Sequence, residues 1–236
     1  MKPSYVAVIP ARAGSKRVKK KNIRPFLDTS LVEIAIEFAM ESKLFDRIIV
    51  SSDDEEVLSL EQDTKYTNVS FVERDEKSAG DTSSAAQVVF HLLGKDILSE
   101  NGTAIVYLQP TSPFRKLYDL MSAVDVFENN GCLQSVVSVA ELSEPQEFLY
   151  QLDKDNSIDI SKSNVRSQDG TKLYKLSGEI YITPLSHFSC LNTDSILTSK
   201  AIAFKSTADC TIDIDTELDF NMAEYIFKIN QEKNND

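Results

Sequence analysis

Residues 5–22, YVAVIPARAGSKRVKKKN, decide the fold class of this chain. The run from Tyr5 to Ile9 is short, apolar and rich in β-branched residues, so it predicts a buried strand that ends at Pro10. A loop that contains glycine, serine and many lysines follows this strand directly. In open α/β sheets, ligands bind beyond the carboxyl ends of the strands, and the loop stands at such a place.

Strand and helix patterns alternate through the first 140 residues. Leu31, Ile34, Ala35 and Phe38 recur at helical spacing, and Asp81 is expected to be the N-cap of a later helix. Repeated strand–helix–strand units imply an α/β fold, with a mostly parallel sheet covered by helices on both faces. Strands are expected at residues 5–9, 47–51, 69–72, 103–108 and 133–139, and a further helix at residues 116–129. The helix after Asp81 is expected to place Ala85, Val88, Val89 and Leu92 on one face.

The pattern changes after Ala140. Residues 141–176 are polar, and we interpret them as an inserted lobe that provides dimer contacts. Strands are expected again at residues 179–183 and 201–204, and Asp215 or Thr216 is expected to cap a last helix that ends near Asn230. The chain is therefore interpreted as a single domain, residues 1–236, with a lobe inserted at about residues 141–176.

Composition excludes several classes of partner. The 236 residues include 37 acidic and 25 basic side chains, a net charge of −12, which disfavours nucleic acid and anionic membranes as partners. No apolar stretch approaches the ~18 residues of a membrane helix, and the apolar run near the N-terminus is too short for a signal peptide. The three cysteines are far apart and lack a Cys-x-x-Cys pair, as is typical of reduced thiols. We expect a cytoplasmic protein without structural zinc.

The loop from Arg12 to Arg24 is the exception to this acidity. It holds seven of the basic residues and no acid. A turn at Gly14-Ser15 exposes backbone N–H groups, which together with the lysines and arginines suit a polyphosphate. The alternative is a solvated basic loop. The spacing matches neither the G-x-x-x-x-G-K-[ST] motif of ATPases nor the G-x-G-x-x-G motif of dehydrogenases.

Two further segments carry candidate chemistry. In Ile212-Asp213-Ile214-Asp215, an extended backbone directs both carboxylates to one face, which beside a polyphosphate is suited to Mg²⁺. The alternative is an acidic pair that favours the start of the next helix. In residues 108–115, LQPTSPFR, Gln109 offers a donor and an acceptor to hydroxyls or a base, and two prolines stiffen the loop. The alternative there is a rigid structural turn.

Together these segments resemble the acylneuraminate cytidylyltransferase family, the synthetases of CMP-sialic acid and of related CMP-nonulosonic acids. The resemblance implies a Rossmann-like three-layer sandwich of the nucleotide-diphospho-sugar transferase type with a small inserted dimerisation lobe, and a homodimer. It also implies an enzyme that uses CTP, a nonulosonic sugar acid and Mg²⁺. The matching stretches are residues 9–23, 47–57, 73–84, 108–115, 178–182 and 212–220, in the order of the family.

The resemblance also implies roles for single residues. Arg12 and Lys21 match the positions that handle the triphosphate, Asp215 matches the metal-binding aspartate, with Asp213 beside it, and Arg12, Lys21 and Asp215 would be the catalytic residues. Gln109 matches a glutamine near the sugar, and Arg166 is similar to an arginine that holds the sugar acid across the dimer interface; Lys175 stands at a third position near the sugar. The nucleotide-binding set would be Arg12, Ala13, Gly14, Ser15, Lys16, Lys21, Asn22, Arg74, Asp81 and Ser84.

Three departures from the family lie near the expected sugar pocket. Ser177-Gly178-Glu179 stands where Asn-Gly-Ala is frequent, Lys175 stands where an arginine is frequent, and the segment after Arg166 lacks a common Leu-Pro. They leave the identity of the sugar acid open. Residues 15–16 and 20–22 differ from the matching residues of the related deoxyoctulosonate enzymes, which favours a nine-carbon sugar acid. Transfer with another nucleoside triphosphate, or a non-catalytic nucleotide-binding protein on the same fold, are the other hypotheses.

Overall fold

A seven-stranded sheet with the order β5-β4-β1-β6-β8-β7-β9 forms the centre of the molecule. The computed structural model describes residues 3–75, 83–98, 103–160, 166–189, 193–208 and 210–235. The strands of the sheet are β1 (Ser4–Ala11), β4 (Arg47–Ser52), β5 (Val69–Glu73), β6 (Thr103–Tyr107), β7 (Val136–Glu141), β8 (Tyr174–Pro184) and β9 (Ile202–Lys205).

The prediction of a mostly parallel sheet is confirmed. Strand β1 pairs in parallel with β4 and β6, β4 with β5, and β7 with β9, whereas β8 is antiparallel to both of its neighbours, β6 and β7. The chain returns from β7 into β8 without a crossover helix, and antiparallel neighbours permit such a connection. Because β1, β4 and β6 run in the same direction, the loops after them meet at one edge of the sheet.

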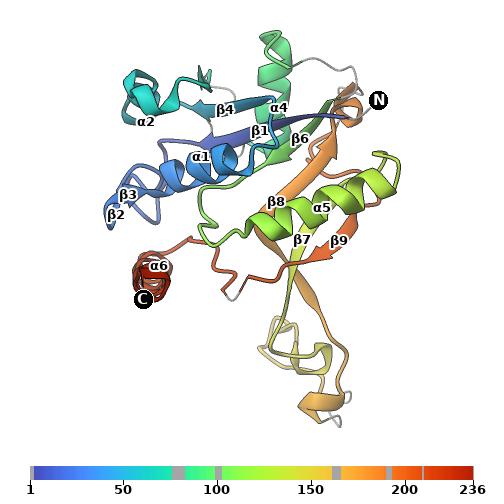
Figure 1. Cartoon of the computed structure of the whole chain (residues 1–236). Helices are drawn as coiled ribbons and strands as arrows, with labels where there is room; N and C mark the ends of the chain where they lie inside the picture. Colours follow the sequence, from blue (N-terminus) through green and yellow to red (C-terminus); the bar gives the residue numbers. More distant parts are fainter. Residues whose placement is uncertain are drawn as a thin grey trace.

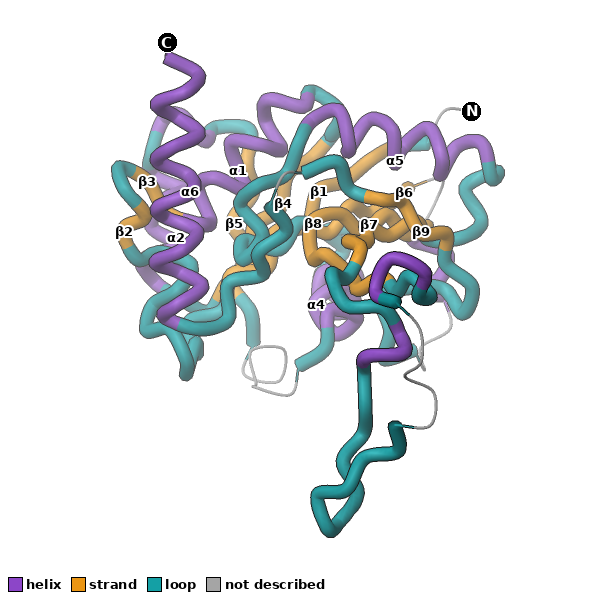
Figure 2. Tube along the Cα trace, turned by 90° about the horizontal axis from the view of Figure 1, so that it is seen from below, coloured by secondary structure: helices purple, strands orange, loops and turns teal. Residues whose placement is uncertain are grey.

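Helices cover both faces of the sheet, as predicted. Helices α1 (Leu31–Ser42) and α5 (Leu117–Asn129) contribute to one apolar core, and α4 (Ala85–Gly94) to the core on the opposite face. Figures 1 and 2 show the sheet between these two layers. The remaining helices are α2 (Glu55–Ser59), α6 (Glu217–Asn235) and the 3₁₀ helices at Leu60–Gln62, Thr64–Tyr66, Gln146–Phe148, Ser167–Asp169 and Leu185–Ser189.

A third, smaller core joins the two ends of the chain. Val18 of the basic loop is fully buried there against Ile214 and Phe220, beside the short hairpin of β2 (Pro25–Phe26) and β3 (Thr29–Ser30). Ile212 is partly buried against the same core. The apolar residues within the basic loop and between the two aspartates thus fix the two segments to each other.

Several element ends differ from the predictions. Ser84, and not Asp81, is the N-cap of α4, because Ser84 and Gln87 form a reciprocal capping box; Asp81 itself lies outside the described residues. The strand predicted from Leu133 begins at Val136, since Leu133 is 76% exposed. The last helix runs on to Asn235, and the Thr216 hydroxyl accepts from the backbone N–H of Asp219 at 3.2 Å, so Thr216 caps its start.

The segment between β7 and β8 projects away from the sheet (Figure 1). Its base is held by Glu141, whose carboxylate lies 2.8 Å from Lys172 Nζ and 2.7 Å from Lys205 Nζ. The segment is not uniformly polar, since it exposes large apolar side chains; a dimerisation lobe with the boundaries 141–176 stays a prediction. Those exposed apolar residues are Phe148, Leu149, Leu152, Ile158 and Ile160. No helix within the described part of the chain is long and apolar enough to cross a membrane.

Candidate active site

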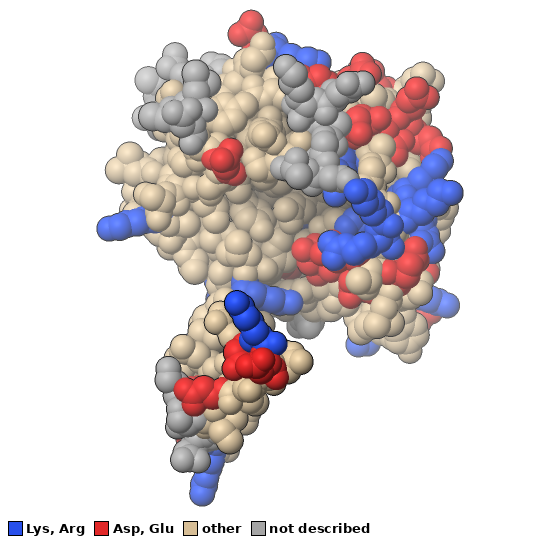
Figure 3. Space-filling view, turned by 180° about the vertical axis from the view of Figure 1, so that it is seen from behind, with Lys and Arg blue, Asp and Glu red and all other residues tan. Residues whose placement is uncertain are grey.

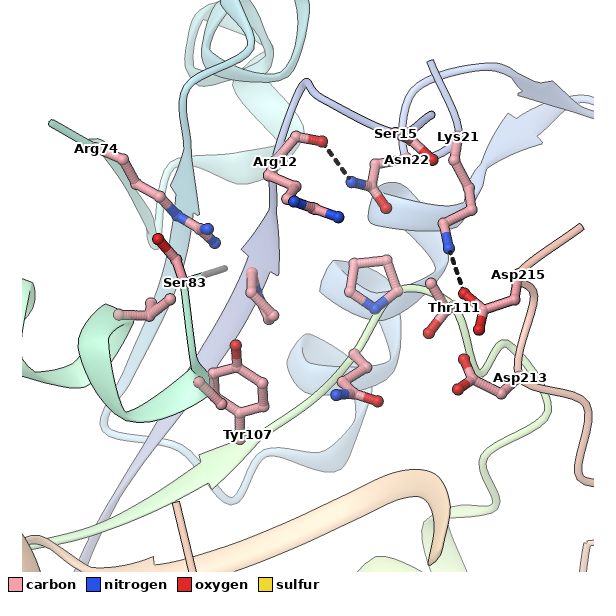
Figure 4. A pocket seen from close by; sticks show the side chains of 15 residues that line it. Arg12, Ser15, Lys21, Asn22, Arg74, Ser83, Tyr107, Thr111, Asp213 and Asp215 are labelled. Carbon is pink, nitrogen blue, oxygen red and sulfur yellow. Dashed lines mark hydrogen bonds and ion pairs between the residues drawn. The ribbon is translucent and has the colours of Figure 1, made fainter. Parts of the chain in front are cut away.

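A cavity of about 290 Å³ opens where the loops after β1, β5 and β6 meet the segment before α6. Figure 4 shows side chains from all of these segments pointing into one space. Cations and carboxylates share this space, which is the chemistry expected of a site for a polyphosphate and a metal ion. Its lining residues are Pro10, Arg12, Ser15, Lys21, Asn22, Arg74, Ser83, Ala85, Val88, Tyr107, Gln109, Pro110, Thr111, Asp213 and Asp215.

The basic loop is held in place by contacts from several elements. The backbone N–H of Ala13 donates to Asp53 Oδ1 at 2.8 Å, and Asn22 Nδ2 donates to the carbonyl of Arg12 at 3.0 Å. Farther along, Arg24 Nη1 donates to both carboxylate oxygens of Glu217 in α6, at 2.9 and 2.7 Å. The side chains that face the cavity therefore start from a fixed backbone. Figure 3 shows Lys and Arg side chains gathered beside Asp and Glu on this part of the body.

Lys21 joins the basic loop to the aspartate segment. Its ammonium donates to the carbonyl of Ile214 and lies 3.4 Å from Asp215 Oδ1. Arg17 lies 3.1 Å from the other carboxylate oxygen of Asp215. Burial lowers the pKa of Lys21, and the charges of Asp215 and Asp213 act in the opposite direction. The two sequence segments that carry opposite charge are thus electrostatically coupled.

The backbone of the aspartate segment is also fixed. Ile214 N–H donates to the Thr111 carbonyl at 2.9 Å, and Asp215 N–H donates to Asp219 Oδ2 at 3.1 Å. Ile214 is fully buried while Asp213 and Asp215 both line the cavity, so the alternation expected from residues i and i+2 is present. The segment belongs to no strand; its direction comes from these hydrogen bonds.

The donor set at this end fits Mg²⁺. Mg²⁺ needs only one or two protein carboxylates when phosphate and water oxygens complete its octahedron, and Asp213 and Asp215 provide two. Across the described ranges there is no cluster of three or more His, Cys, Asp or Glu that would form a cage of protein ligands alone. A magnesium site shared with a phosphate ligand stays a prediction.

The opposite end of the cavity is formed by Arg74 and Tyr107. Arg74 is 7% exposed; its Nε donates to Ser51 Oγ at 3.0 Å and its Nη2 to the Ser51 carbonyl at 2.8 Å. Burial lowers the pKa of Arg74, and it raises the pKa of Tyr107, which therefore remains a neutral phenol. In Figure 4 the Tyr107 hydroxyl points into the space shared with Arg74 and Ser83. This end of the cavity therefore offers a neutral donor, the Tyr107 hydroxyl, and a cationic donor, the Arg74 guanidinium, to a flat polar group.

A family model described as cytidylyltransferase matches residues 6–228. The chain belongs to this cytidylyltransferase family. Among curated relatives, the N-acylneuraminate cytidylyltransferase of Escherichia coli is 29% identical over 99% of this chain, and the pseudaminic acid cytidylyltransferase of Campylobacter jejuni is 30% identical over 96%. The CMP-N,N'-diacetyllegionaminic acid synthase of Legionella pneumophila is 31% identical over 96%.

These relatives differ in length. The chain spans 54% of the Escherichia coli protein but 97% of the Campylobacter jejuni and Legionella pneumophila proteins. Among solved structures, a CMP:2-keto-3-deoxy-manno-octonic acid synthetase complexed with CTP has a TM-score of 0.68 at 16% identity, and covers 96% of this chain and 99% of its own. A 4-diphosphocytidyl-2C-methyl-D-erythritol synthase of Anaerococcus prevotii has a TM-score of 0.65 at 14% identity, with 97% and 100% covered. At these identities the structures show the fold alone.

Most residues that the sequence placed in the cytidylyltransferase site lie at the cavity. Lys16 lines an adjoining cavity of about 280 Å³ with Arg12, Ser15, Arg17, Lys21 and Asp215. Ala13 and Gly14 lie in the same loop, and Ser84 caps α4 next to Ser83. Asp81 is outside the described residues. The sequence-predicted residues that line the larger cavity are Arg12, Ser15, Lys21, Asn22, Arg74, Gln109, Asp213 and Asp215.

Arg166 and Lys175 do not reach the cavity of their own chain. Arg166 is exposed in the projecting segment, and Lys175 is exposed on β8. Within one copy of this cytidylyltransferase they therefore contribute nothing to the site. Their assignment to the sugar stays a prediction.

The structure adds residues that the sequence did not single out. Tyr107 lies at the end of β6, where side chains of one face reach the cavity, and Asp53 follows β4 and holds the basic loop. Both residues stand at the carboxyl end of a strand, so their positions in the sequence could have identified them as site residues. Asp219 acts on Asp215 through a backbone hydrogen bond, for which the sequence holds no separate signal.

Proposed function

We propose that this chain transfers CMP from CTP to the anomeric hydroxyl of a nonulosonic, sialic-acid-like sugar acid and releases pyrophosphate. The observation that carries the proposal is the convergence of the basic loop, the Arg74–Tyr107 end and the Asp213–Asp215 pair on one cavity. Three curated relatives that are named for CMP transfer to nonulosonic acids support the class of substrate.

We infer a place for each part of the reactants from the residues that line the two cavities. The triphosphate would lie along Arg12, Ser15 and Lys21, with its β and γ phosphates toward the adjoining cavity that Lys16 and Arg17 line. The cytosine would lie at the Arg74–Tyr107 end. The sugar acid would then lie between Gln109 and the aspartates, so that its hydroxyl faces the α-phosphate.

The chemistry requires an in-line displacement at phosphorus. The bond from the anomeric oxygen to the α-phosphorus forms while the bond from the α-phosphorus to the bridging oxygen of pyrophosphate breaks, and the proton of the hydroxyl passes to solvent water. Arg12 and Lys21 would stabilise the negative charge that develops on the leaving pyrophosphate. Asp215, with Asp213 beside it, would hold Mg²⁺, which neutralises phosphate charge and orients oxygens when bound. No residue has to form a covalent intermediate.

The identity of the sugar acid is part of the proposal. We favour a nine-carbon acid of the sialic, legionaminic or pseudaminic type over deoxyoctulosonate, because relatives named for these three acids align with nearly the whole chain. Two of the three departures, at Lys175 and at Ser177-Gly178-Glu179, lie on β8, so we infer that the choice among these acids depends on residues specific to this chain.

We propose a homodimer in which the projecting segment of one copy reaches the site of the other. The exposed apolar residues of the segment would be covered in this way, and Arg166 and Lys175, which do not reach their own cavity, would meet the sugar acid of the partner. Light scattering on the purified chain tests the dimer. A monomer at micromolar concentration would contradict it.

Pyrophosphate release with Mg²⁺ and each nucleoside triphosphate tests the reaction class. With a nonulosonic acid present, CTP is expected to give turnover at least about a hundredfold faster than UTP, GTP or ATP, because a site that hydrogen-bonds one base leaves buried groups unpaired with the others. If turnover is faster with another nucleoside triphosphate, that triphosphate and not CTP is the substrate. Binding of CTP without turnover over a panel of keto-sugar acids would favour a non-catalytic nucleotide-binding protein.

A further inference from the structure

Glu179 on β8 is a buried carboxylate without a hydrogen-bond partner. The residue is 3% exposed, and neither carboxylate oxygen accepts a hydrogen bond. The hydroxyls of Ser177 and Ser206 are close, but they donate to Ser138 Oγ at 2.7 Å and to Asp119 Oδ2 at 3.1 Å. Burying an ionisable group without partners costs free energy, so its presence calls for an explanation.

Arg115 supplies a positive charge that acts on Glu179. The residue is 9% exposed, and burial lowers the pKa of Arg115 to about 10, while the charges of Glu179 and Asp213 act in the opposite direction. Burial likewise raises the pKa of Glu179, and the nearby hydroxyls of Ser206 and Ser177 and the charge of Arg115 act in the opposite direction. Each of the two groups therefore reduces the cost of burying the other.

The guanidinium of Arg115 connects the loop after β6 to strand β8. Its Nε donates to the backbone carbonyl of Glu179 at 2.6 Å, and its Nη2 donates to the backbone carbonyl of Gln109. Gln109 follows β6 and lines the cavity, and Glu179 belongs to β8. One side chain thus sets the separation of the two backbones at the end where Gln109 and Asp213 lie.

There is little space at this point for the backbones to shift. Gly178 precedes Glu179 with a φ of +80°, and a Cβ there would lie 2.7 Å from Ser112 Oγ, 3.1 Å from Gln109 Oε1 and 3.8 Å from Asp213 Cγ. The Gly178–Glu179 backbone therefore lies directly against the Gln109 side chain. A displacement of Arg115 would be transmitted to Gln109 and not absorbed by empty space.

We propose that Glu179 and Arg115 form a positioning pair that sets the sugar-acid end of the site. The Glu179 carboxylate keeps the charged guanidinium in place, and Arg115 holds the backbones of Gln109 and Glu179 so that the Gln109 side chain faces the reacting hydroxyl. The inference rests on the proposed function, because it assumes that Gln109 contacts the sugar acid. It adds a determinant of sugar binding that does not itself touch substrate.

The pair is tested by separating the two substrates kinetically. Glu179→Gln keeps the shape of the side chain and removes its charge, and Arg115→Lys keeps the charge and removes the planar fork. Each variant is expected to raise the KM for the sugar acid about tenfold, since small misplacements of an orienting group have large effects, while the KM for CTP stays within about twofold. The double variant is expected to be no worse than the worse single variant, which is the signature of coupled residues.

The control is Glu128→Gln, which removes a half-buried carboxylate that accepts from Tyr5 Oη at 3.0 Å, near the start of β1. It is expected to lower thermal stability without changing either KM. Equal changes in both KM values of the Glu179 and Arg115 variants, no change in either, or additive effects in the double variant would overturn the pair. Should Glu179→Gln fail to fold, Arg115→Lys carries the same comparison.

Wild-type protein distinguishes this inference from the proposed function. If it releases no pyrophosphate from CTP with any nonulosonic acid and binds none of these acids when loaded with CMP, the proposed function fails, and the pair fails with it. If wild type is active and the variants keep its KM for the sugar acid, only the pair is contradicted.

Discussion

Lys21 Nζ lies 3.4 Å from Asp215 Oδ1, although 194 positions separate the two residues in the sequence. The contact joins the loop after β1 to the segment before α6 at one side of the cavity. It also places the two halves of the proposed chemistry, cations for pyrophosphate and carboxylates for a metal ion, next to each other.

Replacing Lys21 tests whether the cations of the basic loop stabilise the leaving pyrophosphate. Lys21→Ala is expected to lower kcat/KM for CTP by about a hundredfold or more, because it removes a charged donor from the leaving group. Lys19→Ala is the matched control, since Lys19 is an exposed lysine of the same loop that lines neither cavity. Steady-state kinetics with varied CTP measures both variants. Equal effects of the two substitutions would show that only the summed charge of the loop matters.

Replacing Asp219 tests the support of the aspartate segment. Its Oδ2 accepts from the N–H groups of Asp215 and Thr216 at 3.1 and 2.7 Å and from Thr216 Oγ1 at 2.8 Å. Asp219→Ala is expected to lower the free energy of unfolding by about 1 kcal/mol, as the loss of a helix cap does, and to raise the Mg²⁺ concentration needed for half-maximal pyrophosphate release. Urea unfolding and a Mg²⁺ titration measure the two effects. An unchanged Mg²⁺ requirement would contradict a role of Asp219 in positioning Asp215 for Mg²⁺.

Gly178 has no room for a side chain. Its φ of +80° is strained for other residues, and a Cβ would lie 2.7 Å from Ser112 Oγ. Gly178→Ala is therefore expected to destabilise the fold by about 1–3 kcal/mol and to raise the KM for the sugar acid more than that for CTP. Gly94→Ala is the control, because a Cβ at Gly94 meets nothing within 4 Å. A Gly178→Ala variant as stable as wild type would refute the close approach.

Glu141 predicts a dependence of stability on acid pH. Hydrogen bonds from Lys172 and Lys205 lower the pKa of Glu141 from 4.5 to about 2. A carboxyl whose pKa is lower in the folded state stabilises the fold above its unfolded pKa, and this contribution is lost as the pH falls from about 4.5 to 2. Wild type should therefore exceed Glu141→Gln in thermal stability at pH 7, and the difference should shrink toward pH 3. A difference that does not change with pH would contradict the assignment.

The parts of the site that sequence could predict are those carried by strand ends. The run from Tyr5 to Ile9 fixed the first strand, and the basic loop after it had to lie on the ligand side of a parallel sheet. Alternation in residues 212–215 also predicted that both aspartates share one face, and in the structure both line the cavity while Ile214 is buried. These inferences depend on local patterns and one general rule of topology.

What the sequence could not predict depends on contacts between distant segments. The burial of Val18 against Ile214 and Phe220 follows from no periodicity, yet it sets the distance between the basic loop and the aspartates. Asp81 was chosen as a cap because its residue type is suitable, but Ser84 has the partner Gln87 at the required spacing. Arg166 and Lys175 line neither cavity of the site, and no local pattern in the sequence could predict their position.

The central claim is tested most directly by mass spectrometry of the products. Purified chain, Mg²⁺ and CTP are incubated with sialic, legionaminic, pseudaminic or deoxyoctulosonic acid, with Asp215→Ala as the inactive control. The account predicts one CMP-nonulosonic acid and pyrophosphate in equal amounts from wild type, and at least about a hundredfold less from Asp215→Ala. A CMP adduct of deoxyoctulosonate alone, or no adduct of any of the four acids, would contradict it.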